Sequence, residues 1–173
     1  MQINRAKKLL EEHSVSDNIV KHVTKVAQIC QFIADNNPKA DKNALICAAL
    51  LHDLFKNTDD HSKEIFNFLN KLGEPKIALI TYKHDFFSII DPQKQPFALE
   101  EKILSYADKR VKFDQIVSLQ ERFDDLKQRY NHDEEDSDKV KKTHHAYFDL
   151  EKELFEPLNI SPNDIKEENL KDL

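Results

Sequence analysis

Glycine is almost missing from this sequence: there is one in 173 residues, against roughly 7% in an average protein. β-Sandwiches, barrels and Rossmann folds use glycine at tight turns and phosphate-binding loops, so the scarcity argues against these classes. Apolar residues make up 39% of the chain, which is enough for a globular core. We therefore expect an all-α protein.

Long apolar runs are also missing. No run approaches the roughly 20 residues that a membrane-spanning helix needs, and residues 1–8 lack the apolar stretch of a secretory signal. The chain has only two cysteines, Cys30 and Cys47, both among apolar neighbours. We interpret them as reduced, buried thiols of a cytoplasmic protein, with a disulfide as the less favoured alternative.

Positive charge is in deficit. Lysine and arginine total 26, aspartate and glutamate 32, and the formal net charge is −6. This balance argues against electrostatically driven binding to nucleic acid, but it leaves room for a local basic pocket that holds one phosphate group.

Helical periodicity dominates the chain up to an acidic, polar run at residues 131–138. We expect a single-domain helical bundle whose core spans residues 1–130. Residues 131–173 should form an acidic loop and a helical C-terminal arm packed on the same domain. The predicted helices cover residues 16–36, 41–53, 62–73, 75–82, 98–117, 119–130, 138–155 and 162–170.

Local signals support several of these helices. Ser16 and Asp41 are predicted N-caps, and Gly73 is a predicted helix stop. The helix after Asp41 is apolar on every side over residues 45–51, so we expect it to be central. Residues 86–90 have strand-like composition but no partner strand, and residues 92–96 form a predicted loop. The inward face of the helix over 62–73 is predicted to comprise Ile65, Phe66, Phe68, Leu69 and Leu72.

Polar side chains occupy three positions where a purely structural helix would place carbon: His22, the pair His52–Asp53, and Asp108. A buried carboxylate without a partner is costly, and two of them beside two histidines are accommodated most easily around a cation. This set of nitrogen and oxygen ligands suits Fe, Mn, Co, Ni or Zn better than Ca.

Each position also has an ordinary structural explanation. A single histidine on an apolar stripe is commonly a hydrogen-bonded core residue, and Asp108 could pair with Lys109 or Arg110. The His52–Asp53 pair could be an exposed pair at a helix end, although an aspartate there is opposed by the helix dipole. A shared site becomes the better interpretation because all three positions lie, in order, on the inward faces of different helices.

In this order, His22, Leu51–Lys56 (LHDLFK) and Tyr106–Arg110 (YADKR) resemble the HD-domain superfamily of metal-dependent phosphohydrolases. That family carries the pattern H…HD…D on a helical bundle, and the resemblance covers about residues 16–115. The middle motif is similar to the HDIGK variant, with Leu54 in place of Ile and Phe55 in place of Gly.

The resemblance implies that His22, His52, Asp53 and Asp108 are the ligands of one divalent transition-metal ion. It implies hydrolysis of a phosphoester of a small molecule, for which we expect a nucleotide. Such an ion lowers the pKa of water and stabilises charge on phosphoryl oxygens. Asp53 is further expected to orient the attacking water. Lys56, three residues later, is expected to bind a phosphate oxygen, with an ordinary solvated lysine as the alternative.

A second function class remains open, namely a non-catalytic HD domain that binds a nucleotide or a partner protein in a regulatory role. The presence of all four ligands favours the enzyme, because a domain that only binds has no chemical need for them.

Other histidines and one aromatic residue complete the candidates. Family members with two metals have further histidines after the HD motif; we identify only His84, so we expect a mononuclear centre. His84 then contacts phosphate or water, or is a plain surface residue. The pair His144–His145 is interpreted as a solvated helix face. Phe55 either narrows the pocket, as a filter of substrate size, or extends the apolar stripe of Leu51 into the core.

Overall fold

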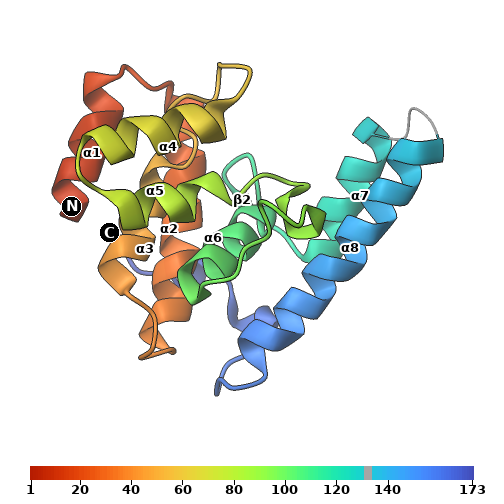
Figure 1. The fold of residues 1–173 in the computed structure, drawn as a ribbon. Coiled ribbons are helices and arrows are strands. Elements are labelled where there is room, and N and C mark those ends of the chain that lie inside the picture. Colours follow the sequence, from red (N-terminus) through yellow and green to blue (C-terminus); the bar gives the residue numbers. More distant parts are fainter. Residues whose placement is uncertain (131–133) are drawn as a thin grey trace.

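The structure is a computed structural model that describes residues 1–130 and 134–173. Within these ranges nearly all of the regular secondary structure is helical, with one short two-stranded hairpin, which confirms the all-α prediction (Figure 1). Part of the predicted acidic loop, residues 131–133, lies outside the described residues. The helices are α1 (Ile3–Glu12), α2 (Asp17–Asp35), α3 (Lys42–Leu51), α4 (His61–Lys71), α5 (Pro75–Tyr82), α6 (Leu99–Lys109), α7 (Leu119–Tyr130) and α8 (Glu134–Phe155).

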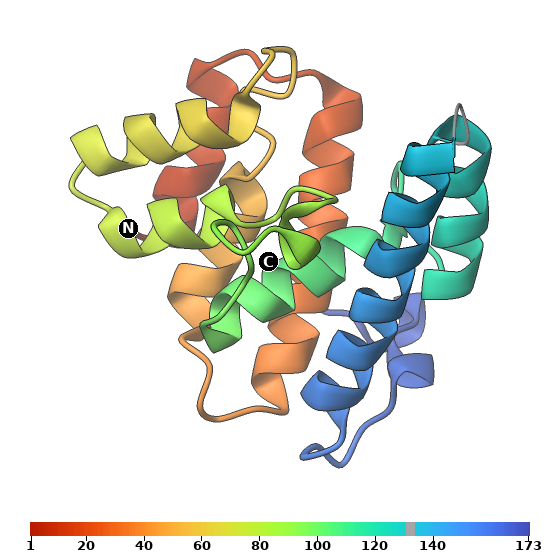
Figure 2. The ribbon, with the colours of Figure 1, turned by 45° about the vertical axis from the view of Figure 1, so that its right-hand side comes forward.

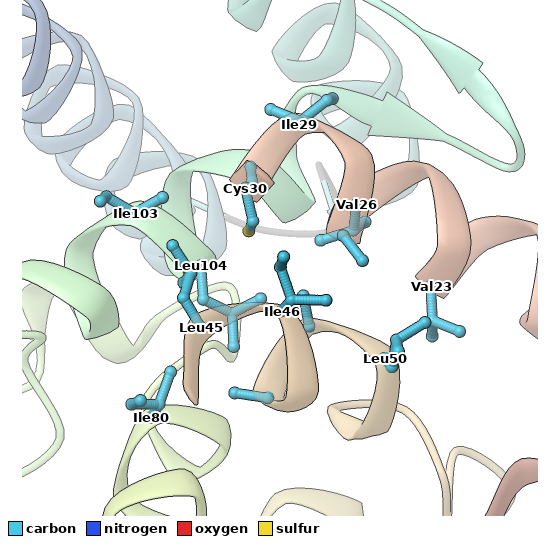
Figure 3. Close-up of a cluster of buried hydrophobic side chains, with 14 of the residues drawn as sticks. Val23, Val26, Ile29, Cys30, Leu45, Ile46, Leu50, Ile80, Ile103 and Leu104 are labelled. Atoms are coloured by element: carbon cyan, nitrogen blue, oxygen red, sulfur yellow. The ribbon is translucent and has the colours of Figure 1, made fainter. Parts of the chain in front are cut away.

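Helix α3 is central, as its composition predicts. The side chain of Asp41 caps it by accepting a hydrogen bond from the backbone N–H of Ala44 (3.1 Å), and every residue from Ala44 to Leu51 is buried. Figure 3 shows Val23, Val26 and Cys30 of α2 pointing toward α3, and residues of α5 and α6 belong to the same core. Burial on all sides leaves this helix little freedom to shift, so residues at its end are precisely positioned.

Helix α2 begins after Ser16, but the Ser16 side chain makes no capping hydrogen bond within the described residues. Helix α4 is capped by Asp60, whose carboxylate accepts a hydrogen bond from the backbone N–H of Lys63. The helix ends before Gly73, which has a φ of +77°. The predicted stop at Gly73 is therefore correct. The prediction that Leu72 points inward is wrong, because 44% of this residue is exposed.

The prediction of one helix over residues 98–117 is also wrong. Helix α6 ends at Lys109, and the chain then forms an antiparallel hairpin of β1 (Val111–Lys112) and β2 (Gln115–Ile116). Arg110 organises this reversal: its Nε donates to the carbonyl of Val117 (2.6 Å), while its own carbonyl accepts from the Val117 N–H (2.9 Å). These two bonds join Arg110 to Val117 across the hairpin. The chain therefore reverses after Lys109, and the helix does not continue.

Helices α7 and α8 form a long antiparallel pair that packs beside the other helices (Figure 2). Helix α8 begins at residue 134, before the predicted start at 138. It is anchored by the buried Tyr147, whose hydroxyl bonds that of Ser105 in α6 (2.9 Å). The strand-like residues 86–90 contain a short 3₁₀ turn, η1 (Ser88–Ile90).

The predicted helix over 162–170 is replaced by two 3₁₀ turns, η2 (Pro162–Asp164) and η3 (Glu167–Asn169). The C-terminal segment then returns to α1, where Lys7 donates to the carbonyl of Leu173 (2.8 Å). Cys30 and Cys47 are buried free thiols, as expected, and burial raises the pKa of Cys47 to about 11. Among the described helices, none combines the length and the apolar character needed to cross a bilayer.

Candidate metal centre

The four predicted ligands converge from three separate helices. His22 lies on α2, His52 and Asp53 follow directly after α3, and Asp108 lies near the end of α6. Oδ1 of Asp108 is 3.0 Å from Nε2 of His22 and 3.6 Å from Nε2 of His52, and Oδ2 of Asp53 is 3.7 Å from the same His52 atom. His52, Asp53 and Asp108 are buried. The structure therefore brings all four residues together.

Backbone carbonyls orient the histidine rings. Nδ1 of His22 donates to the carbonyl of Phe113 (2.8 Å), and Nδ1 of His52 donates to that of Ala49 (2.7 Å). A carbonyl oxygen can only accept, so the proton must reside on Nδ1 in each ring. The Nε2 atoms then face the carboxylates with a lone pair when the rings are neutral. Metal-binding histidines commonly have this arrangement.

His52 gives the clearest indication of a cation site. Its ring is fully buried, and among the described residues no group forms a hydrogen bond with Nε2. Burial lowers the pKa of His52, so the neutral ring with its lone pair on Nε2 is favoured. A buried nitrogen lone pair beside two carboxylates is poorly satisfied by the protein alone, and a divalent cation would satisfy it.

The carboxylates remain ionised despite their burial. Burial alone would raise the pKa of Asp108, but Lys109 and the two histidines hold it well below its usual range. Similarly, the pKa of Asp53 is well below its usual value, because His52, His84 and Lys56 outweigh the effect of burial. Burial opposes the charged form of His22, but its hydrogen bond to Asp108 and the charges of both carboxylates raise its pKa, so a cation would displace a proton from this ring. The centre thus presents two anionic oxygen ligands, the neutral ring of His52 and the ring of His22, a set that fits a divalent transition metal.

A second group of ligands lies next to the first. Nε2 of His84 is 3.5 Å from Oδ1 of Asp53 and 3.2 Å from Nε2 of His61, and Nε2 of His61 is 3.4 Å from the same Asp53 oxygen. Nδ1 of His84 donates to the carbonyl of Thr81 (2.5 Å), so its Nε2 also faces the cluster with a lone pair. Asp53 therefore connects two sets of three residues that could each hold an ion: His22, His52 and Asp53, and Asp53, His61 and His84.

Sequence reasoning overlooked His61 and underestimated His84. His84 is only 2% exposed, so the alternative of a plain surface histidine is wrong. His61 begins α4, just after the acidic residues 59–60, and has no helical periodicity to mark it. The available signal was its place after the HD motif, nine positions from His52. Burial and the proximity of His84 lower the pKa of His61 to about 4, which leaves the ring neutral and able to bind a metal.

Two lysines place positive charge beside the carboxylates. Nζ of Lys56 is 3.1 Å from Oδ1 of Asp53, and its half-exposed side chain reaches the pocket. Lys109 is buried and forms an ion pair with Asp108, and it also donates to the carbonyl of His84 (3.2 Å). Lys109 thus fixes the orientation of the Asp108 carboxylate relative to the second group of ligands.

Apart from the fully buried His52, the candidate ligands and the two lysines line one pocket of about 500 Å³ and form its polar base. Ile19, Phe86, Phe113 and Leu126 provide apolar walls, and Arg122 of α7 contributes a further cation. Nε of Arg122 is buried without a hydrogen-bond partner among the described residues, and Nη1 lies 3.6 Å from Oδ2 of Asp125. The pocket therefore combines a polar, ligand-rich base with apolar walls and an incompletely satisfied guanidinium.

Other candidates lie elsewhere. Phe55 contacts the rings of His13 and Phe68, and it is not among the described residues that line the pocket. His144 of α8 packs against Phe123 of α7 and Phe148 of α8, and His145 is exposed. Of the basic pair after Asp108, only Lys109 faces the site, because Arg110 bonds the Tyr106 hydroxyl and the carbonyls of residues 117 and 162.

Comparison with known proteins agrees with this geometry. The family model described as "HD domain" matches residues 19–111, which is more than half of the chain. The tRNA (cytidine(56)-2'-O)-methyltransferase of Picrophilus torridus is 28% identical over 139 residues. The alignment covers 72% of this chain but 40% of that relative, so the chain spans about two fifths of the relative's length. No solved structure is significantly similar to the chain.

Proposed function

The chain belongs to the HD-domain family, as its motifs indicate, and on that premise we propose that it is a metal-dependent phosphohydrolase. The substrate we propose is a small phosphoester, and specifically a nucleotide. One observation carries the proposal: the buried, unsatisfied Nε2 of His52 faces two ionised carboxylates from different parts of the chain.

The residues proposed to hold an ion are His22, His52, Asp53 and Asp108. Iron, manganese, cobalt, nickel and zinc all accept such a set of ligands. When bound, the ion supplies Lewis-acid chemistry: it polarises a phosphoryl oxygen and acidifies water. Asp53, His61 and His84 offer ligands for a second ion, so we extend the proposal from the single ion that the sequence indicated to two.

The protein's own residues supply orientation and charge. In this proposal Asp53 orients the attacking water, and Lys56 binds a phosphate oxygen through its half-exposed ammonium group. His84, when it holds no metal ion, contacts water or the phosphate: its Nε2 accepts a hydrogen bond from water, and a protonated ring donates one to a phosphate oxygen. Lys109 holds the Asp108 carboxylate in place and keeps it ionised. Most of the catalytic effect would then come from preorganised charge.

The walls of the pocket support a nucleotide as the substrate. A phosphate at the base leaves the apolar surfaces of Ile19, Phe113 and Leu126 for an organic group. Arg122 provides a guanidinium with unused hydrogen-bonding capacity for an anionic oxygen. A volume of about 500 Å³ lies within the range of small-molecule sites.

A panel of phosphoesters tests this proposal. The purified protein, loaded separately with Mn²⁺, Co²⁺, Ni²⁺, Zn²⁺ or Fe²⁺, is incubated with nucleoside mono-, di- and triphosphates, cyclic nucleotides and sugar phosphates. We expect release of phosphate or of a nucleoside phosphate, and its loss with a chelator. Stoichiometric metal without turnover of any substrate would contradict the enzyme and favour the regulatory binding domain.

The similarity to part of a tRNA methyltransferase favours a second candidate, a domain that binds nucleotides within RNA. The net charge of −6 opposes it, because RNA binding depends on neutralising phosphates. A gel-shift titration with tRNA separates the two candidates: salt-sensitive binding without phosphoester hydrolysis would support the RNA-binding role.

We further propose that residues 1–130 and 131–173 act as one domain in the cytoplasm. The bond between Tyr147 and Ser105 supports the first part, since it ties α8 to the helix that carries Asp108. The buried free thiols of Cys30 and Cys47 support the second part.

A further inference from the structure

The hairpin that follows α6 places an aromatic residue in an unfavourable backbone conformation. Only Phe113 and Asp114 connect β1 to β2, and Phe113 has a φ of +59°. Two-residue hairpin turns normally put glycine or asparagine at positions with positive φ, because a side chain is strained there. A bulky ring at this position is therefore a local cost without an evident benefit to the turn itself.

The same residue is tied to the metal centre. Its carbonyl accepts the hydrogen bond from Nδ1 of His22 (2.8 Å), which fixes the turn next to that ligand. This bond uses only the main chain, so it does not require the ring. Phe113 lines the pocket together with His22 and Asp108, yet 70% of the residue is exposed. The ring thus stands at the mouth of the site, outside the core.

The surroundings of the ring suit a ligand that is anionic at one end and flat and apolar at the other. Ile19 and Leu126 belong to the same pocket, and Lys56 and Arg122 place positive charge in it. A planar ring bound through its phosphate at the base would have an aromatic face available at Phe113. Stacking on an aromatic side chain contributes affinity for any nucleobase, because every base has a π-face.

We propose that Phe113 is a specificity-determining residue whose ring stacks on the nucleobase of the substrate. The inference rests on the proposed function for the position of the phosphate. In the strained turn, the main chain of Phe113 orients His22, while its side chain selects ligands that carry a planar ring. The selectivity is thus contributed by a residue beyond the end of the family match at residue 111.

The test compares adenosine 5'-monophosphate with ribose 5-phosphate, which carries the same phosphate on the same sugar but has no base. Steady-state kinetics and calorimetric binding are measured on the Mn²⁺-loaded wild type and on the variants Phe113→Gly, Phe113→Leu and Phe113→Tyr. We expect Gly and Leu to reduce the preference for the nucleotide on the order of tenfold, and Tyr to retain it. Phe97→Leu, which changes an 86% exposed ring outside this pocket, serves as the matched control.

Thermal denaturation separates a binding role from a structural one. Glycine accepts a φ of +59° without strain, so Phe113→Gly should melt at the wild-type temperature or above while losing its nucleotide preference. An unchanged preference in both the Gly and Leu variants would overturn the inference. So would a lower melting temperature of the Gly variant with equal losses for both ligands.

An absence of hydrolase activity can be distinguished from an absence of base recognition by Phe113. In that case the wild type hydrolyses neither compound, and the calorimetric affinities alone decide whether Phe113 recognises the base. Equal affinities of the wild type for the two compounds would overturn the inference whether or not the protein is an enzyme.

Discussion

Nε2 of His52 and Oδ1 of Asp108 lie 3.6 Å apart without a proton available to join them. The histidine proton is on Nδ1, where it is donated to the carbonyl of Ala49, and the carboxylate is held ionised mainly by Lys109. Two buried acceptors that face each other are unfavourable unless a cation lies between them.

The Asp108 carboxylate is expected to be essential for metal binding. Asp108→Ala should remove most of the bound metal and nearly all hydrolysis, because one of two anionic ligands of the first group is lost. Asp108→Asn keeps the side-chain volume and should show the same loss with less disturbance of the fold. Elemental analysis and circular dichroism check both variants, with the exposed Asp149→Asn as a control. Undiminished stoichiometric metal in the Asp108 variants would exclude it as a ligand.

His61 is expected to affect the number of ions and leave the first group intact. If the second group is occupied, the wild type binds two ions, and His61→Ala binds one, because Asp53 and His84 alone remain. Isothermal titration with Mn²⁺ measures the stoichiometry, and His145→Ala, which changes an exposed histidine of α8, is the control. A wild type that saturates with one ion would restore the mononuclear centre that the sequence indicated.

Lys56 is expected to act on the substrate while metal content stays intact. A charge-assisted hydrogen bond is worth roughly 1.5–3 kcal/mol, so Lys56→Ala should lower kcat/KM on the order of tenfold to a hundredfold. Its ion pair with Asp53 is half-exposed and contributes little to stability. Kinetics across the phosphoester panel are compared with those of Lys63→Ala, an exposed lysine of α4. Equal kcat/KM values would make Lys56 an ordinary solvated residue.

Arg122 is expected to bind an anionic oxygen of the substrate. Arg122→Gln should raise KM more than it lowers kcat, because the guanidinium lies in a pocket wall contributed by α7. Arg5→Gln changes an exposed arginine of α1 and provides the comparison. If KM stays constant while the protein melts at a lower temperature, the role of Arg122 is to support α7.

Phe55 is expected to contribute to stability without selecting substrates. Its edge-to-face contacts with His13 and Phe68 lie outside the pocket, so the size-filter hypothesis is not supported. Phe55→Gly should cost about 2 kcal/mol of unfolding free energy, below the roughly 3–5 kcal/mol of a fully buried phenylalanine. Urea denaturation measures this loss. A broader substrate range with unchanged stability would return Phe55 to the role of a filter.

Local sequence patterns were sufficient to predict most of the helices. Asp41, Gly73 and the apolar run of α3 are features of neighbouring residues, and a helix responds mainly to neighbours three or four positions away. The end of α6 was missed because residues 110–117 continue an acceptable helical pattern. What stops the helix is the pair of bonds between Arg110 and Val117 and the packing of β1 against α2.

The sequence by itself determined the helical class and four polar positions: His22, His52, Asp53 and Asp108. A polar residue on an otherwise apolar helix face is recognisable from the periodicity alone. Only the tertiary structure decided that His61 joins His84 at Asp53, that Phe55 turns toward Phe68, and that Phe113 stands beside His22. These outcomes depend on how helices far apart in the chain cross one another. Periodicity describes one helix at a time and contains no information about that crossing.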